Sequence, residues 1–67
     1  MYEIIRAERV AEGISLTVIA PDGEERLVFS FPELIDRGIN AFHLLEAPQK
    51  YLCDPRSRTV ARKQRSG

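Results

Sequence analysis

The sequence predicts a small α+β domain, a small antiparallel β-meander of three to four strands covered by one or two short helices. Two observations carry this prediction. Apolar and polar residues alternate on both sides of a Pro-Asp-Gly turn, a pattern typical of a hairpin of half-buried strands. Residues that start and end helices follow directly after it. We expect a single domain over residues 1–61 and a basic, mobile C-terminal tail over residues 62–67.

The hairpin is the clearest element. Successive side chains of a strand point to opposite faces, so alternation reveals which residues share a face. In the first strand the shared apolar face holds Ile14, Leu16, Val18 and Ala20. In the second it holds Leu27, Phe29 and Phe31. Pro21-Asp22-Gly23 reverses the chain between them, because Pro presets the φ angle of a turn and Gly accepts a positive one.

A third strand is predicted over residues 2–10. Ile4 and Ile5 are neighbours and point to opposite faces, which leaves the register with the hairpin open. Acidic and basic side chains alternate along this strand, and that pattern suits pairing with a matching partner strand at an open sheet edge.

A short helix is predicted next. Ser30 and Glu33 have the spacing of a capping box, in which each side chain accepts a hydrogen bond from the backbone of the other. Gly38 is placed to end the helix in the left-handed conformation. We expect Leu34 and Ile35 to turn toward the sheet.

The remaining elements are shorter. Asn40 can cap a second helical segment that ends before Pro48. Residues 51–53 and 59–61 have the composition of β-strands and flank an Asp54-Pro55-Arg56-Ser57 turn.

Four motifs occur in a familiar order: Asp22-Gly23-Glu24-Glu25-Arg26, Phe31-Pro32-Glu33-Leu34-Ile35, Arg37-Gly38 and Phe42-His43-Leu44-Leu45. Together with the Pro-x-x-Tyr segment that follows, this order resembles the small bacterial family catalogued as domain of unknown function 2442, over roughly residues 3–61. The resemblance implies an α+β partner or regulatory module without catalytic residues. The chain departs from the family pattern after Ala61, where Arg62-Lys63-Gln64-Arg65 stands in place of a Trp-Pro-Asn-Gly-like stretch.

The formal net charge of zero conceals a polarity along the chain. Residues 1–55 carry five basic and ten acidic side chains, a net charge of −5. Residues 56–67 carry five basic side chains and no acidic one, a net charge of +5. Such asymmetry bears on association with partners and not on the fold.

The basic end supplies the candidate contact residues, which are Arg56, Arg58, Arg62, Lys63 and Arg65. Three interpretations stay open. The segment is a solubilising terminus, a tail that docks on an acidic protein surface such as another copy of the chain, or a contact for nucleic-acid phosphates. No aromatic residue accompanies these charges to stack on a base.

Residues for chemistry are scarce. His43 is the only histidine and Cys53 the only cysteine, too few for a four-ligand zinc site or an internal disulfide. We interpret His43 as a surface or helix-flank residue and Cys53 as a small buried hydrophobic residue. The sequence therefore predicts no catalytic residue, no metal site and no cofactor.

These observations predict a non-enzymatic protein-interaction or regulatory module of bacterial type that works as a homo-oligomer or in a hetero-complex. The alternative is a small nucleic-acid-associated protein that uses the basic C-terminal tail. We expect a cytoplasmic location and no membrane partner. No apolar run approaches the roughly 18 residues of a membrane span, and the Met1-Tyr2-Glu3 start lacks the features of a signal peptide.

Overall fold

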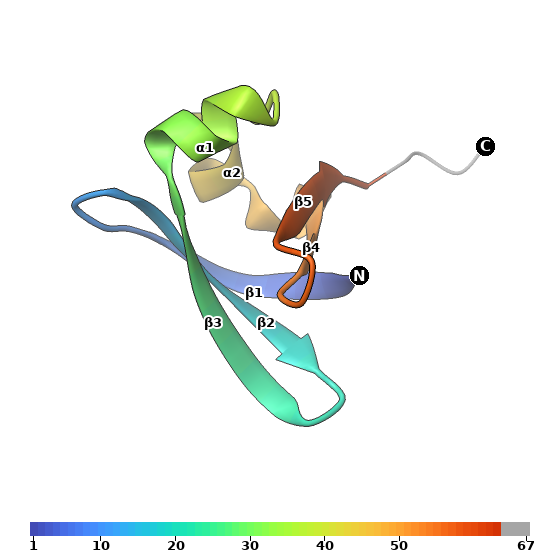
Figure 1. Ribbon diagram of the computed structural model, residues 1–67. Helices are drawn as coiled ribbons and strands as arrows, with labels where there is room; N and C mark the ends of the chain where they lie inside the picture. Colours follow the sequence, from blue (N-terminus) through green and yellow to red (C-terminus); the bar gives the residue numbers. More distant parts are fainter. Residues whose placement is uncertain (64–67) are drawn as a thin grey trace.

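The computed structural model describes residues 1–63. Within these residues the chain forms five strands, two α-helices and one 3-10 turn (Figure 1). In chain order they are β1 (Tyr2–Arg9), β2 (Gly13–Ala20), β3 (Gly23–Ser30), α1 (Phe31–Asp36), α2 (Ala41–Glu46), η1 (Pro48–Lys50), β4 (Tyr51–Asp54) and β5 (Thr59–Arg62). The strands make one antiparallel sheet in the order β3-β2-β1-β4-β5.

The predicted α+β class and antiparallel sheet are confirmed, but the expected number of three to four strands is too low. Both short stretches after η1 become strands and pair with each other as a hairpin. They do so because Cys53 and Val60, which lie opposite each other in this hairpin, are both buried in the core. The core thus extends beneath β4 and β5.

β1 occupies the middle of the sheet and is not an open edge. It pairs with β2 along most of its length and with β4 through Tyr2 and Glu3. The expectation that this strand offers its edge to a partner is therefore wrong, because β4 returns to cover the start of β1. The edges of the sheet are β3 and β5.

A β-bulge in β1 sets the register that the sequence left open. Ile4 pairs with Val18 and Arg6 pairs with Thr17, so Ile5 is an extra residue without its own partner. Ile4 is buried and Ile5 is half exposed, as their adjacent positions predict. Because the bulge shifts the alternation by one residue, Ala7 also packs against the core and Arg6 stays exposed.

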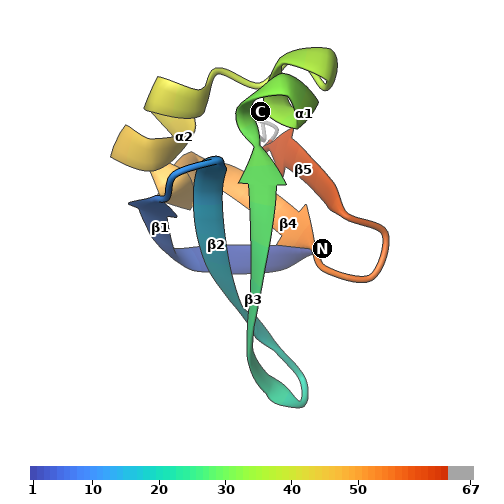
Figure 2. The same ribbon diagram turned by 60° about the vertical axis from the view of Figure 1, so that its left-hand side comes forward.

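The predicted apolar face of the hairpin is confirmed. Ile14, Leu16, Val18 and Ala20 of β2 are all buried, as is Phe29 of β3. The helices supply the cover, with Leu34 of α1 and Leu44 of α2 fully buried. Figures 1 and 2 show the two helices at one end of the curled sheet, while the tip of the β2–β3 hairpin extends away from the other end.

α1 begins and ends much as predicted. Phe31 is its first residue, so it leaves the alternation of β3. The Ser30 hydroxyl accepts a hydrogen bond from the Glu33 backbone N–H at 3.2 Å, which is one half of the capping box. The expected return bond to Ser30 is replaced, because the Glu33 carboxylate binds Arg37 and Arg58.

The C-terminus of α1 is a Schellman motif. Gly38 has φ +72° and donates to the Ile35 carbonyl at 3.0 Å, and Ile39 donates to the Leu34 carbonyl at 2.9 Å. The expectation that Ile35 faces the sheet is wrong, since its side chain is 73% exposed. Consecutive helical residues point about 100° apart, and in this six-residue helix Leu34 takes the face toward the core.

The chain remains part of the fold slightly beyond residue 61. β5 continues to Arg62, and the backbone N–H of Lys63 donates to the Lys50 carbonyl at 2.9 Å. Residues 64–67 of the expected tail lie outside the described residues. Over residues 1–63, no helix has the length and apolar character needed to cross a membrane.

Gly13 provides a test of the close packing at the start of β2. A Cβ atom at this position would lie 1.9 Å from the Phe29 carbonyl oxygen, so the backbone of β2 or β3 would have to move. We expect Gly13→Ala to lower the free energy of unfolding by about 1–3 kcal/mol, the usual cost of overpacking. Urea unfolding measures it, with Glu12→Ala at the exposed neighbouring position as control. Equal unfolding midpoints for the two variants would contradict this packing.

Candidate functional site

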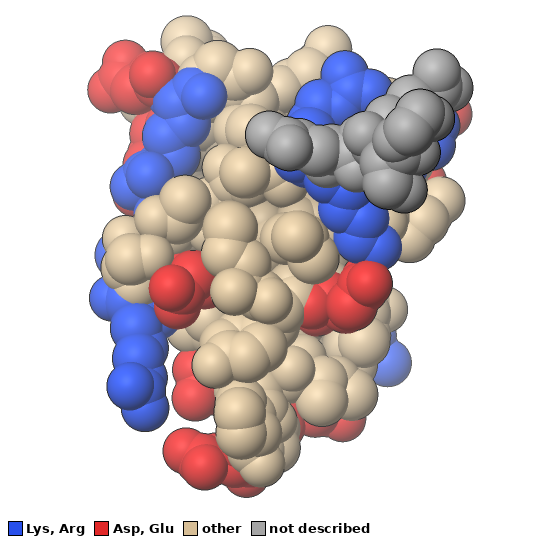
Figure 3. Space-filling model, turned by 90° about the vertical axis from the view of Figure 1, so that its right-hand side faces the viewer, with Lys and Arg blue, Asp and Glu red and all other residues tan. Residues whose placement is uncertain are grey.

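The structure describes four of the five predicted basic contact residues, and these four belong to a turn, the end of a strand and the residue after it instead of a separate tail. Arg56 and Arg58 lie in the turn between β4 and β5, Arg62 ends β5, and Lys63 follows it. Arg65 lies outside the described residues. Figure 3 shows one face of the molecule, with basic side chains along two of its sides and with uncharged surface and acidic groups between them.

Arg58 packs back onto the body of the domain. Its guanidinium group lies over the Phe29 ring, 4.8 Å from the ring centre. One nitrogen of the group lies 2.9 Å from the Glu33 carboxylate and donates to the Val28 carbonyl at 2.9 Å. Arg58 also has a positive φ of +53°, which is uncommon for a residue other than glycine. This side chain thus connects the β4–β5 hairpin with β3 and α1.

Arg37 completes the same cluster from the end of α1. It pairs with the Glu33 carboxylate at 3.1 Å, and its guanidinium carbon lies 5.6 Å from the centre of the Phe29 ring. The hydrogen bond from Arg58, followed by that from Arg37, lowers the pKa of Glu33 below its ordinary value, although partial desolvation opposes the shift. We call Phe29, Glu33, Arg37 and Arg58 the Arg58 clasp.

Lys63 is also engaged with the body. Its ammonium group lies 2.6 Å from the Glu3 carboxylate of β1. The Arg56 backbone N–H donates to the Asp54 carboxylate at 3.0 Å, which fixes the turn and leaves the Arg56 side chain exposed. Among the described residues, the side chains of Arg56 and Arg62 join no ion pair.

The two residues with potential for nucleophilic chemistry have other roles. Cys53 is fully buried as predicted, and burial, with a smaller contribution from Asp54, raises its pKa to about 11, so the thiol is protonated at neutral pH. His43 Nδ1 lies 2.6 Å from the Tyr51 hydroxyl, and the two rings meet edge to face. Within residues 1–63, no three His, Cys, Asp or Glu side chains gather as a metal site.

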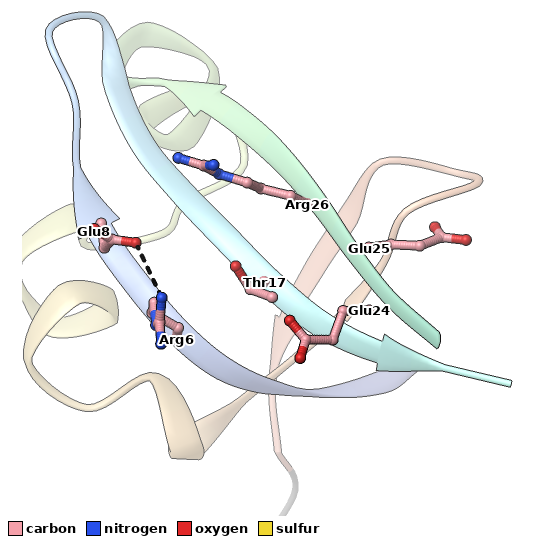
Figure 4. A pocket seen from close by; sticks show the side chains of 6 residues that line it. All are labelled: Arg6, Glu8, Thr17, Glu24, Glu25 and Arg26. Carbon is pink, nitrogen blue, oxygen red and sulfur yellow. Dashed lines mark ion pairs between the residues drawn. The ribbon is translucent and has the colours of Figure 1, made fainter. Parts of the chain in front are cut away.

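A shallow hollow of about 280 Å³ lies on the outer face of β1, β2 and β3 (Figure 4). Arg6, Thr17 and Arg26 form a row across the three strands in paired register. Both arginines have acceptors on this face, since Arg6 pairs with Glu8 at 3.9 Å and Arg26 Nε donates to the Ser15 hydroxyl at 3.0 Å. The hollow is lined by charged and polar residues alone, so it has little to offer a small apolar ligand.

The most exposed large apolar side chains are on the helices. Ile35 of α1 is 73% exposed and Phe42 of α2 is 78% exposed. Neither residue is predicted as a contact from the sequence, because helical spacing alone does not show which side of a six-residue helix meets the core. On the sheet and at the N-terminus, Met1, Ile5 and Ile19 are about half exposed.

Comparison of the chain with models of known protein families, with curated proteins and with solved structures finds no match. The resemblance to domain of unknown function 2442 stays a prediction.

The strain at Arg58 can be separated from its contacts by two substitutions. Arg58→Ala and Arg58→Gly both remove the contacts with Phe29, Glu33 and Val28, but glycine accepts the positive φ without a Cβ penalty. We expect both variants to be less stable than the wild type, and the glycine variant to exceed the alanine variant by about 1 kcal/mol. Urea unfolding measures both, and Arg56→Ala in the same turn is the control. An alanine variant as stable as the wild type would show that the clasp contributes nothing.

The same cluster predicts a pH dependence. Because the pKa of Glu33 is lowered in the folded chain, ionised Glu33 contributes stability above the ordinary value of 4.5, and this contribution is lost as the pH falls through the lowered value. We expect Glu33→Gln to lose less stability than the wild type when the pH is brought from neutral to below 4.5. Thermal unfolding across this range measures the difference. Glu12→Gln, at an exposed carboxylate, should follow the wild-type curve, and the same curve for Glu33→Gln would contradict the prediction.

Proposed function

We propose that this chain is a non-enzymatic protein-interaction module whose helices bind an apolar surface of another protein. The observation that carries the proposal is the exposure of Ile35 and Phe42, each above 70%, in a domain whose helical leucines are all buried or half-buried. Covering a large apolar side chain is worth about 1.5–3 kcal/mol, so two such residues supply a substantial part of the free energy of a weak complex.

The charges beside these residues indicate the chemistry of the partner. Asp36 follows Ile35, and Glu46 ends α2; both are exposed, and neither joins an ion pair within the described residues. Arg37, the neighbouring base, is paired with Glu33. Each of the two exposed apolar side chains therefore has an exposed acidic neighbour on its own helix, which fits a partner with apolar groups bordered by Lys or Arg.

The chemistry of the remaining residues supports a role without catalysis. A nucleophilic mechanism needs an ionisable nucleophile beside a base. Here the thiol of Cys53 is buried and protonated, and Nδ1 of His43 is bound to Tyr51. The resemblance to domain of unknown function 2442 implies the same kind of module, and it is the source of the proposed bacterial type. We also propose a cytoplasmic location, which rests on the features of the sequence described above.

Nucleic-acid binding is the alternative and has less support. Two of the four described basic candidates, Arg58 and Lys63, are paired with Glu33 and Glu3. Arg56 and Arg62 have exposed side chains that remain available for phosphates. Two separate cations give only a weak, salt-sensitive contact.

A site-specific cross-linker tests the proposal. A photoreactive phenylalanine analogue at position 42 is expected to cross-link a protein in the native host, and that protein is then purified. Phe42→Asp and Ile35→Asp should each weaken its binding to the chain at least tenfold, or about 1.4 kcal/mol. Ile19→Asp introduces the same change on the sheet and should bind as the wild type.

Equal binding by Phe42→Asp and the wild type would overturn the proposal. So would binding to generic DNA or RNA at low salt as the only association of the chain, with an affinity that falls when Arg56 and Arg62 are both replaced by Ala. That second result would favour the nucleic-acid alternative.

A further inference from the structure

The edge of β3 has free hydrogen-bonding groups at its N-terminal half. Val10 and Gly13 exchange backbone hydrogen bonds across the β1–β2 turn, so Gly13, Ser15 and Thr17 direct their backbone groups toward β1. The alternate residues Leu16, Val18 and Ala20 of β2 therefore face β3. Their partners Leu27, Glu25 and Gly23 are the hydrogen-bonded residues of β3 within the hairpin. Glu24, Arg26 and Val28 therefore point their N–H and C=O groups away from β2.

Arg58 closes one end of this edge and leaves the other open. The Val28 carbonyl accepts the Arg58 guanidinium at 2.9 Å, which confirms that this residue faces outward. No other described residue donates to or accepts from the outward backbone groups of Glu24 and Arg26. Both residues are exposed and lie in the half of β3 that leads from the projecting hairpin tip (Figures 1 and 2).

We propose that a second copy of this chain pairs with this edge, β3 against β3 in antiparallel orientation, with Glu25 opposite Glu25 at the two-fold axis. Glu24 of each copy then lies opposite Arg26 of the other. This inference goes beyond the proposed function, because the dimer uses the edge of β3 and not the exposed helical side chains. The pairing forms four backbone hydrogen bonds, because Glu24 and Arg26 form a bonded pair on each side of the axis. It also forms two cross-strand ion pairs.

The charged side chains of β3 favour this register over the two registers that are shifted by one residue in either direction. A two-fold axis normal to the sheet keeps each side chain on its own face, so the residue at the axis pairs with itself. With Arg26 at the axis two guanidinium groups would face each other, and with Glu24 at the axis two carboxylates would do so. With Glu25 at the axis two carboxylates also meet, but the pairs directly beside the axis then place Glu24 opposite Arg26. Neither of the other two registers has opposite charges in the pairs directly beside its axis.

A nearby basic side chain of the same chain partly offsets the repulsion between the two Glu25 carboxylates. Glu25 lines a small hollow of about 120 Å³ together with Arg56 and Pro55 of the β4–β5 turn. A basic side chain therefore shares the surroundings of the carboxylate that lies on the axis. Charged edge strands discourage unspecific pairing, and here the order Glu24-Glu25-Arg26 opposes most registers while favouring one.

A charge-exchange experiment tests the pairing. Glu24→Arg and Arg26→Glu should each dimerise at least tenfold more weakly than the wild type, since each places like charges in both flanking pairs. Mixed together, the two variants should form a heterodimer, because every flanking pair is then again Glu opposite Arg. The chain that carries both substitutions should dimerise like the wild type. Analytical ultracentrifugation over a wide concentration range measures the first and third results, and native mass spectrometry measures the mixture.

Glu12→Arg is the matched control, since it reverses a charge in the β1–β2 turn and should leave dimerisation unchanged. Circular dichroism verifies that Arg26→Glu stays folded without its bond to Ser15. A wild-type chain that is monomeric at every concentration, or single variants that dimerise normally, would overturn the inference. Either result leaves the proposed function intact if Phe42→Asp still weakens the cross-linked partner. Conversely, Phe42→Asp should not change dimerisation.

Discussion

The extra residue at Ile5 is the constraint on which the arrangement of this domain depends. β1 pairs with β2 along one edge and with the start of β4 along the other, so a single strand belongs to both halves of the sheet. Without the bulge, the alternation that buries Ile4 would turn Arg6 toward the core and Ala7 toward water. The bulge shifts the alternation by one residue, so that Ala7 faces the core and Arg6 faces water, and it increases the local bend of the strand. Both halves can therefore curl around one core that includes Phe29 and Cys53.

In the curled sheet the β4–β5 hairpin comes close to the opposite edge strand, β3. The Arg58 clasp holds the two together. A chain of this size buries too little surface to be very stable, and its one cysteine is free and buried. Arg58 reaches from the β4–β5 turn to the Val28 carbonyl on the opposite edge strand and covers the ring of Phe29. Its left-handed backbone is the strained conformation that directs the side chain there. A non-covalent contact thus connects the two edges where a disulfide would in a secreted domain of similar length.

What could be predicted from the sequence depended on local patterns. The β2–β3 hairpin, the Ser30 cap, the Gly38 helix end and the burial of Cys53 all follow from short spacings, and the structure confirms them. Short patterns do not determine where a six-residue helix turns its second apolar residue, and Ile35 was wrongly expected in the core.

Such local patterns could not predict contacts between residues that are far apart in the sequence. Arg58 belongs to a run of basic residues in the sequence, and nothing local indicates its contact with Glu33, which lies 25 positions earlier. The same holds for Lys63 and Glu3, which are 60 positions apart. The separation of charge along the chain is real, but in the fold two of its basic members neutralise acidic groups of the body. Within residues 1–63, the basic residues near the end of the sequence therefore do not form an equally positive surface.

The two proposed contact surfaces are linked by the direction of β3. α1 follows directly after Ser30, so antiparallel pairing of two β3 strands places the two helical layers at opposite ends of the paired edge. Each Ser30 is five residues from the axis at Glu25, and a strand rises about 3.3 Å per residue, which separates the two helix starts by roughly 33 Å. A partner that carries two apolar sites at this spacing gains from the effective concentration of the second contact, whereas a partner with one site meets each helical layer independently. Dimerisation would thus select between partners by their geometry without altering either binding surface.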